Sequence, residues 1–102
     1  MTRQTTVYSL IDPRNQQIFY VGKTYQKTSD RLLKHLSESR SDKHTTPKHD
    51  YIRGIVADGH KPMISTIRVY DTEEEALQAE TELINQYIVM GYPITNSRKI
   101  IK

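Results

Sequence analysis

The sequence predicts an α+β fold in which a small three-stranded, mainly antiparallel sheet is flanked by helices, in the order β-β-α-α-β-α. Three observations lead to this prediction. A chain of 102 residues has room for one modest core, so we treat residues 1–102 as a single domain. Two segments with β-strand composition flank a run of turn-forming residues. Helix start and stop signals then bracket three amphipathic segments.

Three segments have the composition of β-strands. Thr5–Ile11 mixes β-branched and aromatic residues, and Ile18–Gly22 does so again after the turn formers of Asp12–Gln17. These two segments should form an antiparallel hairpin whose second strand breaks at the glycine. Pro62–Tyr70 alternates well enough to be the third strand, and residues 91–102 should form a turn and a further short strand.

Three helices are expected between and after these strands. Each has a hydroxyl residue placed to cap its first turn: Thr28 or Ser29 for the first, Thr46 for the second and Thr72 for the third. The helices should cover Asp30–Ser39, a segment from Pro47 to just before Gly59, and a segment from the Thr72–Glu75 capping box to about Met90. Leu32, Leu33 and Leu36 should form the core-facing side of the first helix.

Composition narrows the possible functions. The absence of cysteine excludes disulfides, thiol chemistry and cysteine-based zinc sites. The four histidines show no H-E-x-x-H spacing, so a zinc-dependent hydrolase is disfavoured. No segment approaches the ~18 apolar residues of a membrane span, and the N-terminus has no signal-like apolar run. We therefore expect a cytoplasmic protein with no membrane partner, in the cytoplasm of the host cell if the protein is phage-encoded.

The charges are distributed unevenly along the chain. The net charge is +3, and basic residues predominate between Lys23 and Lys61, where all the histidines also lie. Acidic residues concentrate in the third helix segment, between Asp71 and Glu82. This asymmetry favours a face that binds a polyanion, although an ordinary solvated surface would have the same composition.

One carboxylate lies in an unexpected place. On a helical wheel of the third helix, Glu80 falls inside the apolar arc formed by Ala76, Leu77, Leu83, Ile84, Tyr87 and Ile88. Glu75 and Glu82 fall on the polar side. A carboxylate among core positions needs a compensating partner, because an unpaired buried charge is costly. It could form an ion pair, reach solvent at the edge of the stripe, or serve a site as metal ligand or acid–base.

Arg31 and His35 form a second candidate pair. They are four residues apart, so on a helix they share a face. An arginine can bind phosphate oxygens in a bidentate way that a lysine cannot reproduce. The pair therefore fits a phosphate-binding group, while a solvated helix face would show the same spacing.

These residues occur in an order that resembles the GIY-YIG nuclease domain. Val7–Leu10 (VYSL) and Tyr20–Thr24 (YVGKT) are similar to the paired signature of that family, with Thr6 in place of its first glycine. The similarity continues through three later elements: Arg31 with His35, the A-x-x-x-E-x-x-x-I of Ala76, Glu80 and Ile84, and Asn96 in PITN. It extends from about Thr6 to Asn96, and the order and spacing of the elements make it specific.

The resemblance implies hydrolysis of DNA phosphodiester bonds by a single-metal endonuclease. Glu80 would hold one Mg²⁺ or Mn²⁺ ion with several waters. Arg31 would neutralise charge that develops on the phosphoryl group. Gly22 would let the backbone turn closely past the site, and Asn96 would brace it by hydrogen bonds.

The resemblance also implies a base that deprotonates water. Tyr8 is the first candidate, with Tyr20 positioning the water and Lys23 lowering the pKa of the phenol or holding phosphate. A free tyrosine has a pKa near ~10, so a nearby cation is needed for this role. His35 is the competing candidate, because its unperturbed pKa is near ~6.5.

The expected partner is DNA. Lys48, His49 and Arg53 of the second helix are candidates for contact with the DNA backbone. No DNA-reading domain is apparent, so the domain would cleave with loose specificity, pair with a second copy of the chain or depend on a partner protein. A small free-standing endonuclease of a phage or mobile element is the expected role. The alternative is a catalytically inactive nucleic-acid-binding module of the same fold.

Overall fold

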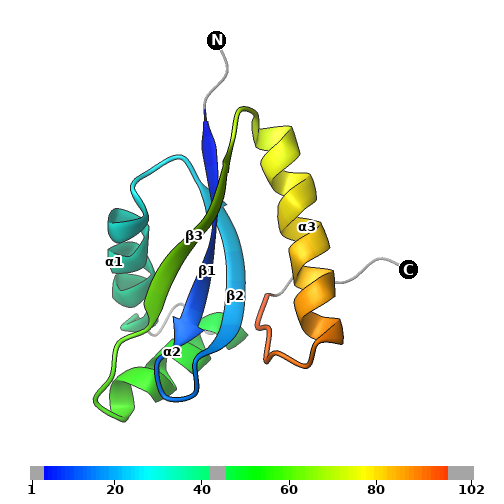
Figure 1. Cartoon of the computed structure of the whole chain (residues 1–102). Helices are drawn as coiled ribbons and strands as arrows, with labels where there is room; N and C mark the ends of the chain where they lie inside the picture. Colours follow the sequence, from blue (N-terminus) through cyan, green and yellow to red (C-terminus); the bar gives the residue numbers. More distant parts are fainter. Residues whose placement is uncertain (1–3, 42–45, 97–102) are drawn as a thin grey trace.

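The computed structural model describes residues 4–41 and 46–96, and it confirms the predicted order of elements. The strands are β1 (Thr5–Asp12), β2 (Gln17–Thr24) and β3 (Met63–Tyr70). The helices are α1 (Thr28–Ser39), α2 (Pro47–Ala57) and α3 (Glu73–Val89). The sheet is antiparallel with the order β2-β1-β3, so the first strand is central. Figure 1 shows α1 and α2 on one side of the sheet and α3 on the other.

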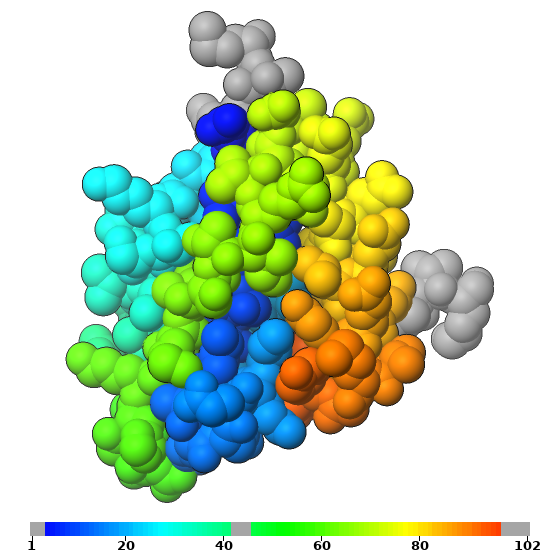
Figure 2. Space-filling view, in the orientation of Figure 1, coloured from blue at the N-terminus to red at the C-terminus, as the bar shows by residue number. Residues whose placement is uncertain are grey.

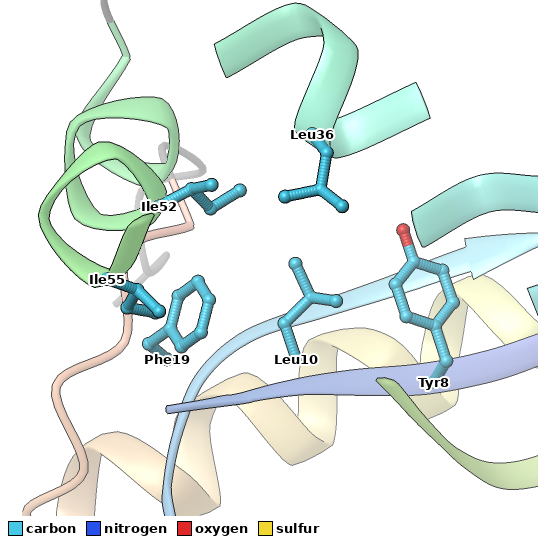
Figure 3. Close-up of a cluster of buried hydrophobic side chains, with 6 residues drawn as sticks. All are labelled: Tyr8, Leu10, Phe19, Leu36, Ile52 and Ile55. Atoms are coloured by element: carbon cyan, nitrogen blue, oxygen red, sulfur yellow. The ribbon is translucent and has the colours of Figure 1, made fainter. Parts of the chain in front are cut away.

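Each side of the sheet has its own hydrophobic core, because successive strand residues point to opposite faces. The core beneath α1 and α2 is built from Tyr8, Leu10, Phe19, Leu36, Ile52 and Ile55 (Figure 3). The core beneath α3 is built from Val7, Val21, Ala76 and Ile84. Helices α1 and α2 therefore cover one face of the sheet, and the glutamate-rich helix α3 covers the other.

A β-bulge in β2 changes which residues face α1 and α2. Leu10 pairs with Tyr20 and Ile11 pairs with Ile18, so Phe19 is an extra residue in the ladder. As a result the consecutive residues Phe19 and Tyr20 both pack against the same core. The Phe19 ring stacks on Tyr51 at 4.4 Å between ring centroids. The bulge thus adds Phe19 to the face on which Tyr20, the strand partner of Leu10, already lies beside Tyr8.

Two of the three helix starts follow the sequence prediction. The Thr46 hydroxyl accepts a hydrogen bond from the His49 amide at 3.4 Å, and Pro47 begins α2. The Thr72 hydroxyl accepts from the Glu75 amide at 3.1 Å. The cap predicted for the first helix is wrong. Helix α1 already begins at Thr28 after Lys27, whose side chain makes no capping bond.

The strand boundaries also differ from the prediction. Strand β2 continues through Gly22 to Thr24, so the glycine lies inside a strand and marks no turn. Strand β3 begins one residue after Pro62, which has no amide hydrogen to donate to the sheet. Residues 91–96 form no strand, and residues 97–102 of the predicted terminal strand lie outside the described residues.

Several apolar residues expected in the core are exposed. Leu33 is 64% exposed, because α1 contacts the core through Leu36 and His35. Leu77 and Ile88 lie at the margin of the α3 apolar arc and are also exposed, since only the centre of that arc meets the sheet. Side chains of β3 form the front surface between α1 and α3 in Figure 2. Within the described residues, no helix combines the length and apolarity needed to cross a membrane.

The β1–β2 turn is held by a buried carboxylate. Asp12 is fully buried and accepts hydrogen bonds from the Arg14 side chain at 2.9 Å and from the Tyr51 hydroxyl at 2.9 Å. Arg14 also pairs with Asp58 at 2.7 Å, so the turn is tied to the end of α2. The hydrogen bond from Arg14 outweighs burial and lowers the pKa of Asp12 to about 2.

We expect Asp12→Asn to destabilise the protein at neutral pH and to have a smaller effect in acid. Because the pKa of folded Asp12 (about 2) lies below its ordinary value of 3.8, its contribution is fully present above about pH 4 and is lost as the pH falls toward 2. Denaturant unfolding of both proteins across this range measures the difference. Asp58→Asn is the control, because Asp58 shares Arg14 but is exposed. A difference that stays constant down to pH 2 would contradict the assignment.

Candidate active site

The hydroxyl of Tyr8 lies at the centre of the predicted site. Tyr8 is fully buried on β1, and its hydroxyl lies 2.8 Å from Nε2 of His35 on α1. In Figure 3 the phenol points from β1 toward this helix. Burial raises the pKa of Tyr8 well above its ordinary value, and the charges of Tyr20 and Glu80 raise it further. The nearby Arg31 guanidinium lowers the pKa of Tyr8, but by less than burial raises it.

His35 is neutral in this setting. It is fully buried, and burial together with the charges of Lys48 and Arg31 lowers its pKa to about 2. A neutral imidazole accepts through one ring nitrogen, so the Tyr8 O–H can donate to the lone pair of Nε2. This hydrogen bond fixes the orientation of the phenol, and the charge of Arg31 lies close enough to lower the pKa of the Tyr8 hydroxyl.

Arg31 offers a hydrogen-bond donor to a ligand. Its Nη1 atom is buried and has no hydrogen-bond partner in the described part of the chain. A buried donor left without a partner is costly, and guanidinium groups bind phosphate oxygens well. Arg31 and His35, predicted to share a helix face, both lie next to Tyr8. The arrangement therefore provides a position for an anionic oxygen beside Arg31.

Tyr20 and Lys48 extend the site toward α2. The Tyr20 ring is half-buried and lies edge-on to His35 at 5.4 Å and tilted against Tyr8 at 6.3 Å between centroids. The Lys48 ammonium lies 4.8 Å from the centroid of the Tyr20 ring. A charge on Tyr20 would raise the pKa of Tyr8. The position of Lys48 beside Tyr20 could not be read from the sequence, because it depends on how α2 packs against β2.

Glu80 approaches from α3. It is only 5% exposed, between the buried residues Ala76 and Ile84 on the helix face that meets the sheet. Its charge raises the pKa of the Tyr8 hydroxyl, although α3 covers the opposite side of the sheet from α1. The placement inferred from the helical wheel is thus where the structure puts this carboxylate.

The donor set fits a hard divalent cation held by few protein ligands. A carboxylate oxygen is a preferred ligand of Mg²⁺, which usually retains several waters and binds phosphate oxygens. Among the described residues, no three His, Cys, Asp or Glu side chains cluster as a closed metal site would require. Glu80 can therefore hold such an ion only together with water and a ligand, as in an open site.

Gly22 is required by the packing of Tyr8. It pairs with Tyr8 across the strands, and a Cβ atom at this position would lie 2.5 Å from the Tyr8 hydroxyl oxygen and 2.9 Å from the Tyr20 ring. The phenol lies directly over the glycine. The glycine therefore makes room for the two tyrosines within a continuous strand. The sequence predicts a turn at this position, but the reason for the glycine is packing and not a turn.

Asn96 and Lys23 lie around β2 in different ways. The Asn96 side-chain amide donates to the Val21 carbonyl at 2.7 Å and accepts from the Val21 amide at 3.1 Å, so it pairs with the edge of the strand between Tyr20 and Gly22.

Lys23 pairs with Glu73 of α3 at 2.9 Å. Its strand partner is Val7, which faces α3, so Lys23 lies on the opposite face from the Tyr8 phenol.

Two residues predicted to contact DNA make bonds within the protein. His49 is buried, and its ring nitrogens lie 2.6 Å from the Thr46 hydroxyl and 3.3 Å from Glu38. Arg53 donates to the carbonyls of Ser39 and Ser41 and to Asp50. Both therefore join α2 to the end of α1, and of the three α2 residues only Lys48 is brought to the tyrosines.

Comparison with known protein families agrees with this geometry. The family model described as the GIY-YIG catalytic domain matches residues 4–92. The chain therefore belongs to the GIY-YIG family, which is a family of nucleases. Searches of curated proteins and of solved structures gave no significant match.

We expect Gly22→Ala to displace the phenols and to destabilise the protein by about 1–3 kcal/mol, the usual cost of overpacking. Gly54→Ala is the matched control. A Cβ at Gly54, inside α2, would contact nothing within 4 Å, so the helix should gain about 0.5–1 kcal/mol. Denaturant unfolding measures both. Equal effects of the two substitutions would show that the contact with Tyr8 is unimportant.

Proposed function

We propose that this protein is a metal-dependent endonuclease that hydrolyses DNA phosphodiester bonds with a single metal ion. One observation carries the proposal. A guanidinium on α1, whose buried Nη1 has no hydrogen-bond partner among the described residues, and a buried carboxylate on α3 both act electrostatically on the Tyr8 phenol from opposite sides of the sheet. Opposite charges held around one position suit a phosphate and its counter-cation. Membership of a nuclease family supports the same reaction.

Glu80 is the proposed metal ligand, and Mg²⁺ or Mn²⁺ fits its carboxylate oxygens. When bound, such an ion supplies positive charge to a non-bridging phosphate oxygen and to the leaving 3′-oxygen. Burial of Glu80 between core residues fixes its side chain, because rotation would require repacking against the sheet. The helix thus holds this ligand in position before substrate binds.

Arg31 is the proposed contact of the protein with the scissile phosphate. Its Nη1 can donate to a phosphate oxygen, and this bond strengthens as charge accumulates during attack by water. Tyr8 lies next to Arg31 and is hydrogen-bonded to the neutral imidazole of His35, so both residues help to position the guanidinium. Both are fully buried, which suits a positioning role better than direct contact with water.

Tyr20 is the proposed proton acceptor for the attacking water. Tyr8 and His35 are both poorly suited to this step. The raised pKa of Tyr8 makes its phenolate scarce, and a pKa near 2 makes His35 a weak base. Tyr20 is half-buried and lies beside a lysine, so it has the access and the neighbouring cation that the role requires.

The first experiment is cleavage of supercoiled plasmid with Mg²⁺, with Mn²⁺ and with EDTA. We expect metal-dependent nicking or linearisation that Glu80→Ala reduces by at least about 100-fold, because the metal ligand is lost. Glu82→Ala is the control, since Glu82 lies on the same helix but is exposed. Cleavage that survives Glu80→Ala would mean that the site is wrong. Binding of DNA without cleavage in any metal would favour an inactive binding module.

A second test separates the two tyrosines. Tyr20→Phe should lower the single-turnover rate by about 100-fold or more, because it removes the proton acceptor. Tyr8→Phe should also lower the free energy of unfolding, by about 1–3 kcal/mol, because Nε2 of His35 loses its donor. Single-turnover cleavage and denaturant unfolding are measured for both variants. Full activity of Tyr20→Phe would remove Tyr20 from the chemical step.

A further inference from the structure

Lys48 is a half-buried cation that no signature element of the nuclease family includes. It follows Pro47 in the first turn of α2, and its ammonium lies over the Tyr20 ring at 4.8 Å from the centroid. Its charge is the largest electrostatic influence on His35. Lys48 therefore faces the tyrosine cluster, while its neighbour His49 is buried in bonds to Thr46 and Glu38.

The charge of Lys48 is incompletely compensated within the described part of the chain. Its ammonium forms no ion pair there. Burial lowers its pKa, the charge of Glu38 raises it, and the charge of Arg31 lowers it. Glu38 is itself engaged by His49 at 3.3 Å. Two cations, Lys48 and Arg31, thus repel one another in a partly desolvated region.

An anion near both cations would relieve this repulsion. The buried Nη1 of Arg31 has no partner within residues 4–41 and 46–96, so a negatively charged oxygen would satisfy it as well. A ring face beneath the ammonium contributes a weaker cation–π attraction that leaves its N–H groups available for oxygen acceptors. A nucleic-acid backbone presents such oxygens at regular intervals along each strand.

We propose that Lys48 is a second phosphate-binding residue of the nuclease site, which holds the DNA backbone beside the phosphate bound by Arg31. This proposal rests on the proposed function in taking DNA as the ligand. Lys48 then holds the substrate in the ground state as well as in the transition state, so its loss raises KM, and any accompanying fall in kcat reflects its position beside Tyr20.

Binding of a short fluorescein-labelled DNA duplex, followed by fluorescence anisotropy in EDTA, tests the proposal without cleavage. Lys48→Met retains the length of the side chain and removes its charge. We expect roughly 10-fold weaker binding and a slope of log K against log salt that is smaller in magnitude by about 0.9, measured between about 50 and 200 mM salt. Lys48→Arg should retain most of the slope, because arginine also binds phosphate.

Lys61→Met is the matched control. Lys61 lies beyond the opposite end of α2 and is exposed, and its loss changes the net charge by the same amount. We expect its slope to equal that of the unmodified protein. An equal loss of slope in Lys61→Met would overturn the proposal, because net charge alone would then explain the effect. A melting temperature for each variant establishes that it is folded.

Plasmid cleavage by the same variants separates the two proposals. If Lys48→Met retains the full salt slope but turns over slowly, Lys48 acts through Tyr20 and the phosphate role is wrong, while the nuclease assignment stands. If the protein never cleaves DNA but Lys48→Met loses the slope and Lys61→Met does not, the phosphate role stands without the nuclease.

Discussion

The packing of the Tyr8 phenol over Gly22 is the constraint on which the site depends. The central strand places a large buried ring against an edge strand, and only a residue without a side chain leaves space for it. The hydroxyl then lies 2.8 Å from Nε2 of His35 on α1, next to Arg31. One close contact between two strands thus sets the position of the guanidinium that we assign to the scissile phosphate.

The two faces of the sheet contribute different chemical groups to the surroundings of the Tyr8 hydroxyl. Helices α1 and α2 supply cations and a neutral imidazole, while α3 supplies a buried carboxylate from the other side. The sheet has only three strands, and β2 is an edge strand next to the central β1. Tyr20 lies on the same side as Tyr8 because it pairs with Leu10, which faces that core. Asn96 pairs with the Val21 backbone and holds the strand that carries this tyrosine.

Within this arrangement the two tyrosines have different electrostatic environments. Tyr8 is enclosed and hydrogen-bonded, so burial keeps its phenol protonated and suits it to orientation. Tyr20 lies nearer the surface beside Lys48, where an ionised phenolate costs less. A similar division separates the α2 residues, because His49 and Arg53 join the two helices while Lys48 faces the tyrosines.

The order of elements, the start of α2 and α3, and the exceptional position of Glu80 could all be predicted from the chain, because periodicity and capping are local properties. The family could also be recognised from motifs in the right order. The packing role of Gly22 within a strand, the exposure of Leu33 and the position of Lys48 over Tyr20 emerged from the folded protein alone. These features depend on contacts between segments distant in the chain, which no local pattern encodes. The pKa values of Tyr8 and His35 could not be predicted for the same reason, since they are set by burial, which is a property of the folded whole.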